Sequence, residues 1–323
     1  MKIAAFYSDS PFAGWVQCQG FAEILERMGH EVIAIPVPAT YQVTQAQVDK
    51  INKPIDDCEL ILVSGPEWLR PWIQRFYPQW NTLKMPKVGW YHESFIREDF
   101  TLDYFKYQDM FDYHFFPDKE DAARYKGEWL PLGVDIKLFH PFTDQGLIAE
   151  KERDIAVAFI GLMYPKRAEF FEQVKPHLGD IQIQMRVAER AGGGLHPGIA
   201  VFDFQGLNIR RSMELLAETY RRIKVFVTFP SMSRVVVAKV LESLACGCTL
   251  VCPKQPIDLP CYEYETPQQC AKAIRQALHT PKWGGSIGLD HHMKLRFEQI
   301  FKKAGLCSRA TSLPEPADSL VTI

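Results

Sequence analysis

The first half of the chain alternates short apolar runs with amphipathic stretches. Runs that suit strands buried on both faces of a sheet lie at 2–7, 31–37, 58–65, 87–94 and 112–118. Between the first two runs, apolar residues recur at helical spacing over 15–28, and Gly29 is placed to end that helix. The segment 128–141 closes this half. Such alternation is typical of a parallel sheet covered by helices.

The alternation restarts after a polar segment at 143–154, where we place a domain boundary. In the second half, strands are expected at 154–161, 181–188, 224–230 and 248–253. Helices are expected at 166–174, 211–223, 235–247, 266–279 and 289–301. Thr266 is the expected cap of the fourth of these helices. The pattern predicts an α/β fold with two Rossmann-like parallel-sheet domains, and residues just beyond the carboxyl ends of the strands should face the cleft between them.

This prediction divides the chain into four parts. Residues 1–145 form the first Rossmann-like domain, and residues 150–288 form the second. The helix within 289–306 is expected to pack back on the first domain, and the Ser/Pro/Asp-rich tail 307–323 is expected to be disordered. With 323 residues and a hydrophobic share of 47%, the chain is long enough to bury two cores.

Net charge and the lengths of the apolar runs argue against several classes of protein. The formal net charge is -2, so no basic excess points to nucleic acid or to an anionic membrane. No apolar run approaches the roughly 20 residues of a membrane span. The chain begins without a charged-then-apolar leader, so we expect no signal peptide and a cytoplasmic, reducing compartment.

Four of the eight cysteines lie between 246 and 261. A zinc site would need paired ligands on a tight loop, whereas Cys246 and Cys248 lie at the end of an expected helix and Cys252 lies in an expected strand. Cysteine in such places behaves as a small core residue. We therefore expect buried thiols, without disulfides and without a bound metal.

The segment 224–253 carries the strongest chemical signal. A strand runs into a Pro-Ser turn, and a helix and a second strand follow at once. Amides at the start of that helix, from Ser231 to Val235, would bind an anion. Glu242 lies on the helix among apolar neighbours, where a carboxylate needs partners. Two ribose hydroxyls would supply them, as in dinucleotide-binding folds; the alternative is a solvated glutamate on an exposed helix face.

This segment resembles the nucleotide-binding core of retaining GT-B glycosyltransferases of the group 1 type. In that family a glutamate holds the ribose, and small residues follow it. Glu242, followed here by SLACG, matches this glutamate. The family often has an earlier glutamate eight positions before, where this chain has Arg234. That departure leaves the catalytic assignment and the retaining or inverting outcome open. Lys239 shifts the likeness toward the divergent spore-coat CgeB-like branch, in which a basic residue shortly precedes the glutamate.

Two further segments match the same family. Residues 130–141 resemble its interdomain segment, with a tight turn expected at Gly133 and Asp135 bonding nearby backbone. In 159–171 a strand ends at Gly161, and Lys166 and Arg167 then open a helix. The family uses a basic residue there to neutralise the diphosphate. A solvated basic pair is the alternative, but cations are disfavoured at a helix N-terminus.

The resemblance also assigns roles to the first domain and to the remaining donor contacts. His92 is similar to the family histidine that touches the donor sugar; it joins Lys166 and Arg167 as an expected catalytic residue, although a packed polar histidine is an equal alternative. Glu93 and Trp68 are candidates for acceptor binding, and Gly14 could let helix amides approach the diphosphate. Further donor contacts are expected at Gly161, Arg186, Val187, Gln205, Ser231, Ser233, Arg234, Val235 and Lys239.

The resemblance implies a hexosyltransferase with the GT-B fold. The donor would be a nucleotide-diphosphate sugar, UDP-glucose or a similar UDP-sugar, bound by the second domain, and the acceptor a hydroxyl group held by the first. The sequence contains no Asp-x-Asp triplet, so we expect fixed cations in place of a metal and no cofactor besides the donor. The acceptor, the sugar, the general base and the oligomeric state stay open.

Two alternative functions on the same scaffold remain. Arg234 in place of the earlier glutamate favours a non-catalytic nucleotide-sugar-binding protein. A nucleotide-sugar epimerase would convert the donor without an acceptor. A Rossmann oxidoreductase lacks support, because no Gly-x-Gly-x-x-Gly follows the first strand.

Overall fold

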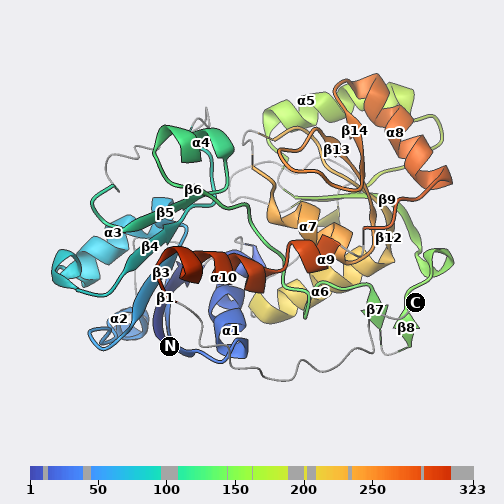
Figure 1. The fold of residues 1–323 in the computed structure, drawn as a ribbon. Helices are drawn as coiled ribbons and strands as arrows, with labels where there is room; N and C mark the ends of the chain where they lie inside the picture. The colour runs from blue at the N-terminus through green and yellow to red at the C-terminus, as the bar shows by residue number, and fades with distance from the viewer. Residues whose placement is uncertain are drawn as a thin grey trace.

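The computed structural model describes residues 1–9, 14–38, 45–95, 108–143, 145–161, 163–187, 200–201, 209–231, 235–284 and 287–306. The chain forms two parallel sheets, each flanked by helices, and Figure 1 shows the two resulting lobes side by side. The predicted α/β fold with two Rossmann-like domains is therefore confirmed.

The first sheet has the strand order β2-β1-β3-β4-β5-β6, and every pair is parallel. Its strands are β1 (Lys2–Ser8), β2 (Glu31–Val37), β3 (Leu60–Ser64), β4 (Lys87–Trp90), β5 (Tyr113–Phe116) and β6 (Glu128–Trp129). Successive β1 residues point to opposite faces, and each face meets its own apolar cluster. This double burial explains the uninterrupted apolar run at the start of the chain.

Helices cover both faces of the first sheet. They are α1 (Gln19–Arg27), α2 (Gln45–Ile51), α3 (Pro66–Phe76), α4 (Lys119–Arg124) and, from the far end of the chain, α10 (Met293–Lys303). In Figure 1 the red helix α10 lies beside the blue helix α1. The Phe297 ring of α10 meets the Phe21 ring of α1 edge-on, with centroids 5.2 Å apart.

The second sheet has the order β11-β10-β9-β12-β13-β14 and is also parallel throughout. Its strands are β9 (Ile155–Gly161), β10 (Gln184–Val187), β11 (Ala200–Val201), β12 (Ile223–Val227), β13 (Thr249–Pro253) and β14 (Cys261–Tyr264). The helices of this lobe are α5 (Pro165–Val174), α6 (Ile209–Arg222), α7 (Ala238–Ala245), α8 (Pro267–His279) and α9 (Ile287–Asp290).

Shorter elements complete the chain. An antiparallel ribbon links the lobes, formed by β7 (Phe142–Thr143) and β8 (Gly146–Leu147). The 3-10 turns are η1 (Trp15–Gln17), η2 (Trp80–Thr82), η4 (Glu150–Glu152) and η5 (Lys175–His177). No described helix is both long and apolar enough to cross a membrane. The seven described cysteines are free and buried, so their predicted burial is confirmed.

Several element boundaries differ from the sequence prediction. The helix expected over 15–28 is split at Cys18, because the backbone of Cys18 is not helical, with φ of -126° and ψ of -138°. The helix expected from 235 begins at Ala238, because Val237 is extended. The helix expected at 289–301 divides into α9 and α10. The helices α2, α3 and α4 and the edge strand β14 were not anticipated.

The predicted cap of α8 is confirmed, because the Thr266 hydroxyl accepts a hydrogen bond from the Gln269 amide. The tail 307–323 lies outside the described residues.

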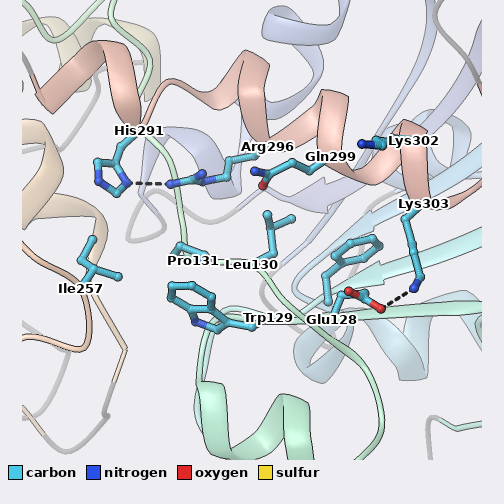
Figure 2. A pocket seen from close by; sticks show the side chains of 11 residues that line it. Glu128, Trp129, Leu130, Pro131, Ile257, His291, Arg296, Gln299, Lys302 and Lys303 are labelled. Carbon is cyan, nitrogen blue, oxygen red and sulfur yellow. Dashed lines mark hydrogen bonds and ion pairs between the residues drawn. The ribbon is translucent and has the colours of Figure 1, made fainter.

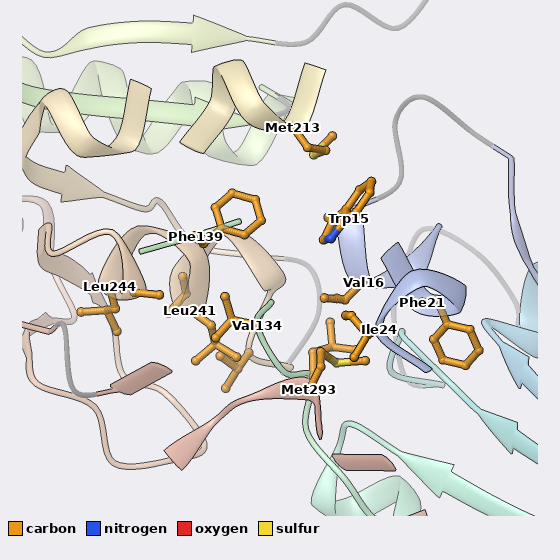
Figure 3. Close-up of a cluster of buried hydrophobic side chains, with 14 of the residues drawn as sticks. Trp15, Val16, Phe21, Ile24, Val134, Phe139, Met213, Leu241, Leu244 and Met293 are labelled. Carbon is orange, nitrogen blue, oxygen red and sulfur yellow. The ribbon is translucent and has the colours of Figure 1, made fainter. Parts of the chain in front are cut away.

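One apolar cluster joins the two lobes. Trp15 and Val16 of the first lobe share this cluster with Met213 and Leu241 of the second lobe. Phe139, from the linking segment at 130–141, belongs to it as well (Figure 3). This shared core places the start of α7 against the loop that follows β1.

Asp135, on the linking segment, is fully buried and bonded on several sides. It accepts hydrogen bonds from Trp15 Nε1 at 2.8 Å, Arg27 Nη2 at 2.7 Å and the Lys137 amide at 3.1 Å. The local backbone bond was predicted from the sequence, whereas the bonds to Trp15 and Arg27 were not. These longer-range bonds tie the linking segment to the first lobe.

Candidate functional site

The carboxyl end of β9 carries a lysine from another element. Lys239 projects from the first turn of α7, and its ammonium donates to the Ile160 carbonyl at 3.2 Å. A Cβ on Gly161 would lie 2.6 Å from the Lys239 Nζ, and the φ of +149° at Gly161 also favours glycine. The same ammonium lies 4.6 Å from the centroid of the Phe159 ring. Gly161 therefore makes room for the lysine head at the end of the strand.

Arg167 brings a second cation to the same strand end. Its side chain is 5% exposed, and its guanidinium lies 4.3 Å from the Tyr164 ring centroid and 5.4 Å from that of Phe159. Burial lowers the pKa of Arg167. Tyr164 in turn donates its hydroxyl to the Pro230 carbonyl at 2.8 Å, which ties the start of α5 to the turn after β12.

Lys166 behaves differently from its neighbour, because it is exposed. The expected basic pair is therefore separated: Arg167 turns inward toward the strand end and Lys166 turns outward. Helical geometry explains this, since consecutive residues project about 100° apart.

Glu242 lies one turn beyond Lys239 on α7 and is 3% exposed. Its Oε1 atom is buried and makes no hydrogen bond within the described part of the chain. Burial raises the pKa of Glu242 to about 8, against the opposing effect of Lys239. Burial and the charge of Arg167 hold the pKa of Lys239 well below its usual value. The alternative of a solvated surface glutamate is wrong, and the carboxylate has hydrogen-bonding capacity to spare.

Gly14, in the loop after β1 of the first lobe, lies next to the start of α7, the helix that carries Lys239 and Glu242. A Cβ on Gly14 would lie 3.4 Å from the Cβ of Ala238, the first residue of α7. The Gly14 amide donates to the Gln17 side chain at 3.0 Å, and the turn that follows is a three-residue 3-10 turn. The loop after β1 thus abuts the start of α7, with its Gly14 amide already engaged.

A second polar group lies at the carboxyl ends of β3 and β4. His92 is 6% exposed, and its Nε2 lies 3.1 Å from the Ser64 hydroxyl. One oxygen of buried Glu67 accepts from the amides of His92 at 2.8 Å and Glu93 at 3.1 Å. These bonds end β4 earlier than the expected 87–94, because the amides bond a side chain instead of a neighbouring strand.

Burial sets the ionisation of this second group. It lowers the pKa of His92 to about 3 and raises that of Glu67 to about 8. The imidazole is therefore neutral at physiological pH. Gly65, with φ of +77°, forms the left-handed turn that brings Pro66 and Glu67 back beneath His92.

The remaining predicted residues fall into three sets. Trp68 is half exposed beside Gly65, and Glu93 is half-buried next to His92. Ser231 is exposed and Val235 is buried. Arg186 and Val187 belong to β10, but their side chains lie outside the described part of the structure, as do residues Gln205, Ser233 and Arg234.

Sequence reasoning missed the supporting residues Phe159, Tyr164, Ser64 and Glu67. Their one detectable signal is position, since all four flank the carboxyl ends of strands. Within the described residues, no group of three or more His, Cys, Asp or Glu side chains is arranged to hold a metal.

Two surface cavities are lined by other residues. One, of about 520 Å³, lies between β6 and α10 (Figure 2). The other, of about 620 Å³, lies beside α1 and includes Tyr7, Arg27 and Arg210. The predicted site residues line neither cavity.

Comparison with known proteins identifies the fold. No family model matches the sequence, and no curated protein matches it. Among solved structures, the chain resembles an alpha-glucosyltransferase in complex with UDP and a 13-mer DNA containing a central A:G mismatch. The identity is 12% and the TM-score 0.64, with 94% of this chain and 100% of that chain covered.

Two further structures are similar over nearly the whole chain. HepE of Anabaena in complex with UDP-glucose aligns at 12% identity and a TM-score of 0.57, covering 94% of this chain and 98% of that one. Sucrose-phosphate synthase from Thermosynechococcus elongatus aligns at 15% identity and 0.54, covering 94% and 96%. The chain therefore has the GT-B fold, with two facing parallel-sheet domains.

Proposed function

We propose that this protein is a glycosyltransferase that moves a hexose from a UDP-sugar, such as UDP-glucose, to a hydroxyl acceptor. One observation carries the proposal: a buried carboxylate with an unused oxygen, Glu242, shares α7 with Lys239, whose ammonium lies with Arg167 at the end of β9. The structural neighbours solved with UDP or UDP-glucose support the choice of donor.

In this proposal the second lobe holds the donor. Glu242 accepts hydrogen bonds from the two ribose hydroxyls, which meets its unused hydrogen-bonding capacity. Burial and Arg167 lower the pKa of Lys239, and the negative charge of a bound diphosphate opposes that effect and favours the protonated lysine. Lys239 and Arg167 then stabilise the charge that develops when the sugar leaves. These fixed cations do the work that a metal would do in a metal-dependent transferase, so the reaction is proposed to be metal-independent.

The transfer breaks the bond between the sugar C1 and the diphosphate oxygen and forms a bond from C1 to the acceptor oxygen. The departing diphosphate takes the acceptor proton, so no protein base is required. The neutral His92 faces the sugar from the first lobe as a hydrogen-bonding group. We propose retention of the anomeric configuration, and Glu93 and Trp68 as acceptor contacts.

A hydrolysis and transfer assay tests this function. The protein is incubated with UDP-glucose, and release of UDP and of glucose is followed with and without a panel of hydroxyl acceptors. UDP release that requires Lys239 and Arg167 supports the proposal. Tight UDP-glucose binding without turnover would instead identify a binding protein, the second candidate that Arg234 favours. Conversion of the sugar without UDP release would identify an epimerase.

A further inference from the structure

The cavity between β6 and α10 is built by both lobes (Figure 2). Trp129 and Leu130, at the end of the first sheet, form one wall, and Ile257, between β13 and β14, closes one side. Arg296 and Gln299 of α10 line the opposite wall. With about 520 Å³, it is large enough for a small organic molecule.

Arg296 is a buried cation, and no anionic side chain of the described residues pairs with it. Its side chain is 6% exposed, and its Nε atom makes no hydrogen bond within the described residues. Its Nη2 lies 2.6 Å from the Nδ1 of His291, and Figure 2 shows the arginine directed along the cavity toward that ring. Burial lowers the pKa of both groups, so the imidazole is neutral and accepts this bond. Buried charges are normally paired, and no described carboxylate pairs with Arg296.

The other charges at the cavity are also mostly positive. Lys302 and Lys303 line it together with a single acid, Glu128, which Lys303 engages at 2.5 Å. Three cations against one carboxylate leave an excess of two positive charges. The cavity therefore favours a ligand that carries negative charge.

The wall opposite these cations is apolar and partly open. Trp129 is 38% exposed, and the ammonium of Lys119 lies 4.3 Å from its ring centroid. Leu130 and Ile257 extend the apolar surface. Such a wall suits a ring or short hydrocarbon body attached to the anionic group.

We propose that this cavity binds an organic anion, a phosphate or carboxylate group on an aromatic or apolar body, with Arg296 as the principal anion contact. The site is separate from the proposed donor group, because Gly161, Arg167, Lys239 and Glu242 do not line it. The inference does not rest on the proposed transferase activity. Because both lobes contribute walls, the bound anion also stabilises their arrangement.

Isothermal titration of the full chain with phenyl phosphate tests the proposal. We expect measurable binding of phenyl phosphate and at least tenfold weaker binding of inorganic phosphate, which lacks the apolar body.

Two variants and one control test which cation of the cavity binds the phosphate group. Arg296→Met should weaken phenyl phosphate binding at least tenfold and leave the Tm equal or higher, because an apolar side chain replaces an unpaired buried charge. Lys302→Gln should weaken it about two- to fivefold, as expected for an exposed cation. Lys272→Gln, exposed on α8 in the second lobe, is the matched control and should bind normally.

Two results would contradict the assignment. One is undiminished affinity in Arg296→Met. The other is a lowered Tm in Arg296→Met together with unchanged affinity in Lys302→Gln, which would make the arginine a structural group. If Arg296→Met does not fold, Arg296→Lys replaces it: the retained charge should preserve part of the affinity, and full affinity would count against a specific guanidinium contact.

Discussion

At the scale of single residues, burial decides the chemistry of the candidate site. Glu242, Glu67 and His92 are ionisable side chains that are almost completely enclosed, and burial moves the pKa of each toward its neutral form. A sequence shows that such residues exist but not that they are enclosed.

Glu242→Ala should weaken UDP binding about ten- to a hundredfold, because it removes the acceptor of two ribose hydroxyls and each hydrogen bond contributes about 0.5–1.5 kcal/mol. Isothermal titration with UDP measures the change. Glu169→Gln, an exposed glutamate on α5 in the same lobe, is the control and should bind as the unchanged protein does. Equal UDP affinity in Glu242→Ala and in the control would remove the ribose assignment.

His92 should make the protein less stable in mild acid. Its pKa is about 3 in the folded chain against 6.5 when solvated, so between these values the unfolded state binds one more proton than the folded state. Stability due to this group is complete above pH 6.5 and falls as the pH drops, by about 1.4 kcal/mol per pH unit.

Urea denaturation at pH 6.5, 5.5 and 4.5 measures this effect. His92→Gln, which keeps a polar group near Ser64, should show a shallower loss of stability over the same range. Parallel pH profiles for the two proteins would show that the histidine is not held neutral by burial.

At the scale of elements, the carboxyl end of β9 gathers side chains from two helices. Arg167 comes from α5 and Lys239 from α7, and both approach the Phe159 ring. The predicted partners Lys166 and Arg167 are adjacent in sequence, yet only one of them turns inward.

Because Arg167 is buried and Lys166 is exposed, substitutions at the two positions should have different effects on UDP binding. Arg167→Met should weaken UDP binding more than uridine binding, because the lost cation faces the diphosphate, whereas Lys166→Met should change both affinities little. Titrations of each variant with UDP and with uridine give the ratio of the two dissociation constants. Equal losses for the two ligands in Arg167→Met would argue against a diphosphate role.

At the scale of the whole molecule, the linking segment and one shared apolar cluster hold the lobes together. Asp135 is the polar centre of that contact, because it bonds both Trp15 and Arg27 of the first lobe. An ion pair at the surface also connects the two lobes: Glu23 of α1 lies 2.6 Å from Arg210 of α6.

Asp135→Ala should lower the free energy of unfolding by about 1–3 kcal/mol, because it leaves the buried Trp15 indole without its acceptor. The Arg27 side chain is 37% exposed, so water can take the place of its lost partner. Glu23→Gln, which breaks the exposed pair, should cost about 1 kcal/mol or less. Urea denaturation of both variants compares them directly. A similar small loss in each would mean that Asp135 contributes nothing beyond a surface contact.

Hydrophobic periodicity alone determined the architecture of this protein. Runs buried on both faces occur only where helices cover both sides of a sheet, so the two parallel sheets could be derived from strands such as 2–7 and 154–161. Glycines at strand ends and a cap such as Thr266 are local signals and could be read in the same way. The helices α2 and α4 and the edge strand β14 escaped prediction, because a few residues carry too little periodicity. Helix α3 escaped although it has 11 residues, because Pro71 lies inside it and proline is a signal against a helix interior.

The tertiary structure alone decided which polar residues meet. Lys239 reaches Gly161 from 78 positions away, and Glu67 reaches the amides of His92 and Glu93 across a left-handed turn. Arg296 is buried because a helix from the end of the chain returns to the first lobe. Local periodicity sets the element that a residue joins, whereas enclosure and pairing depend on the packing of elements far apart in sequence.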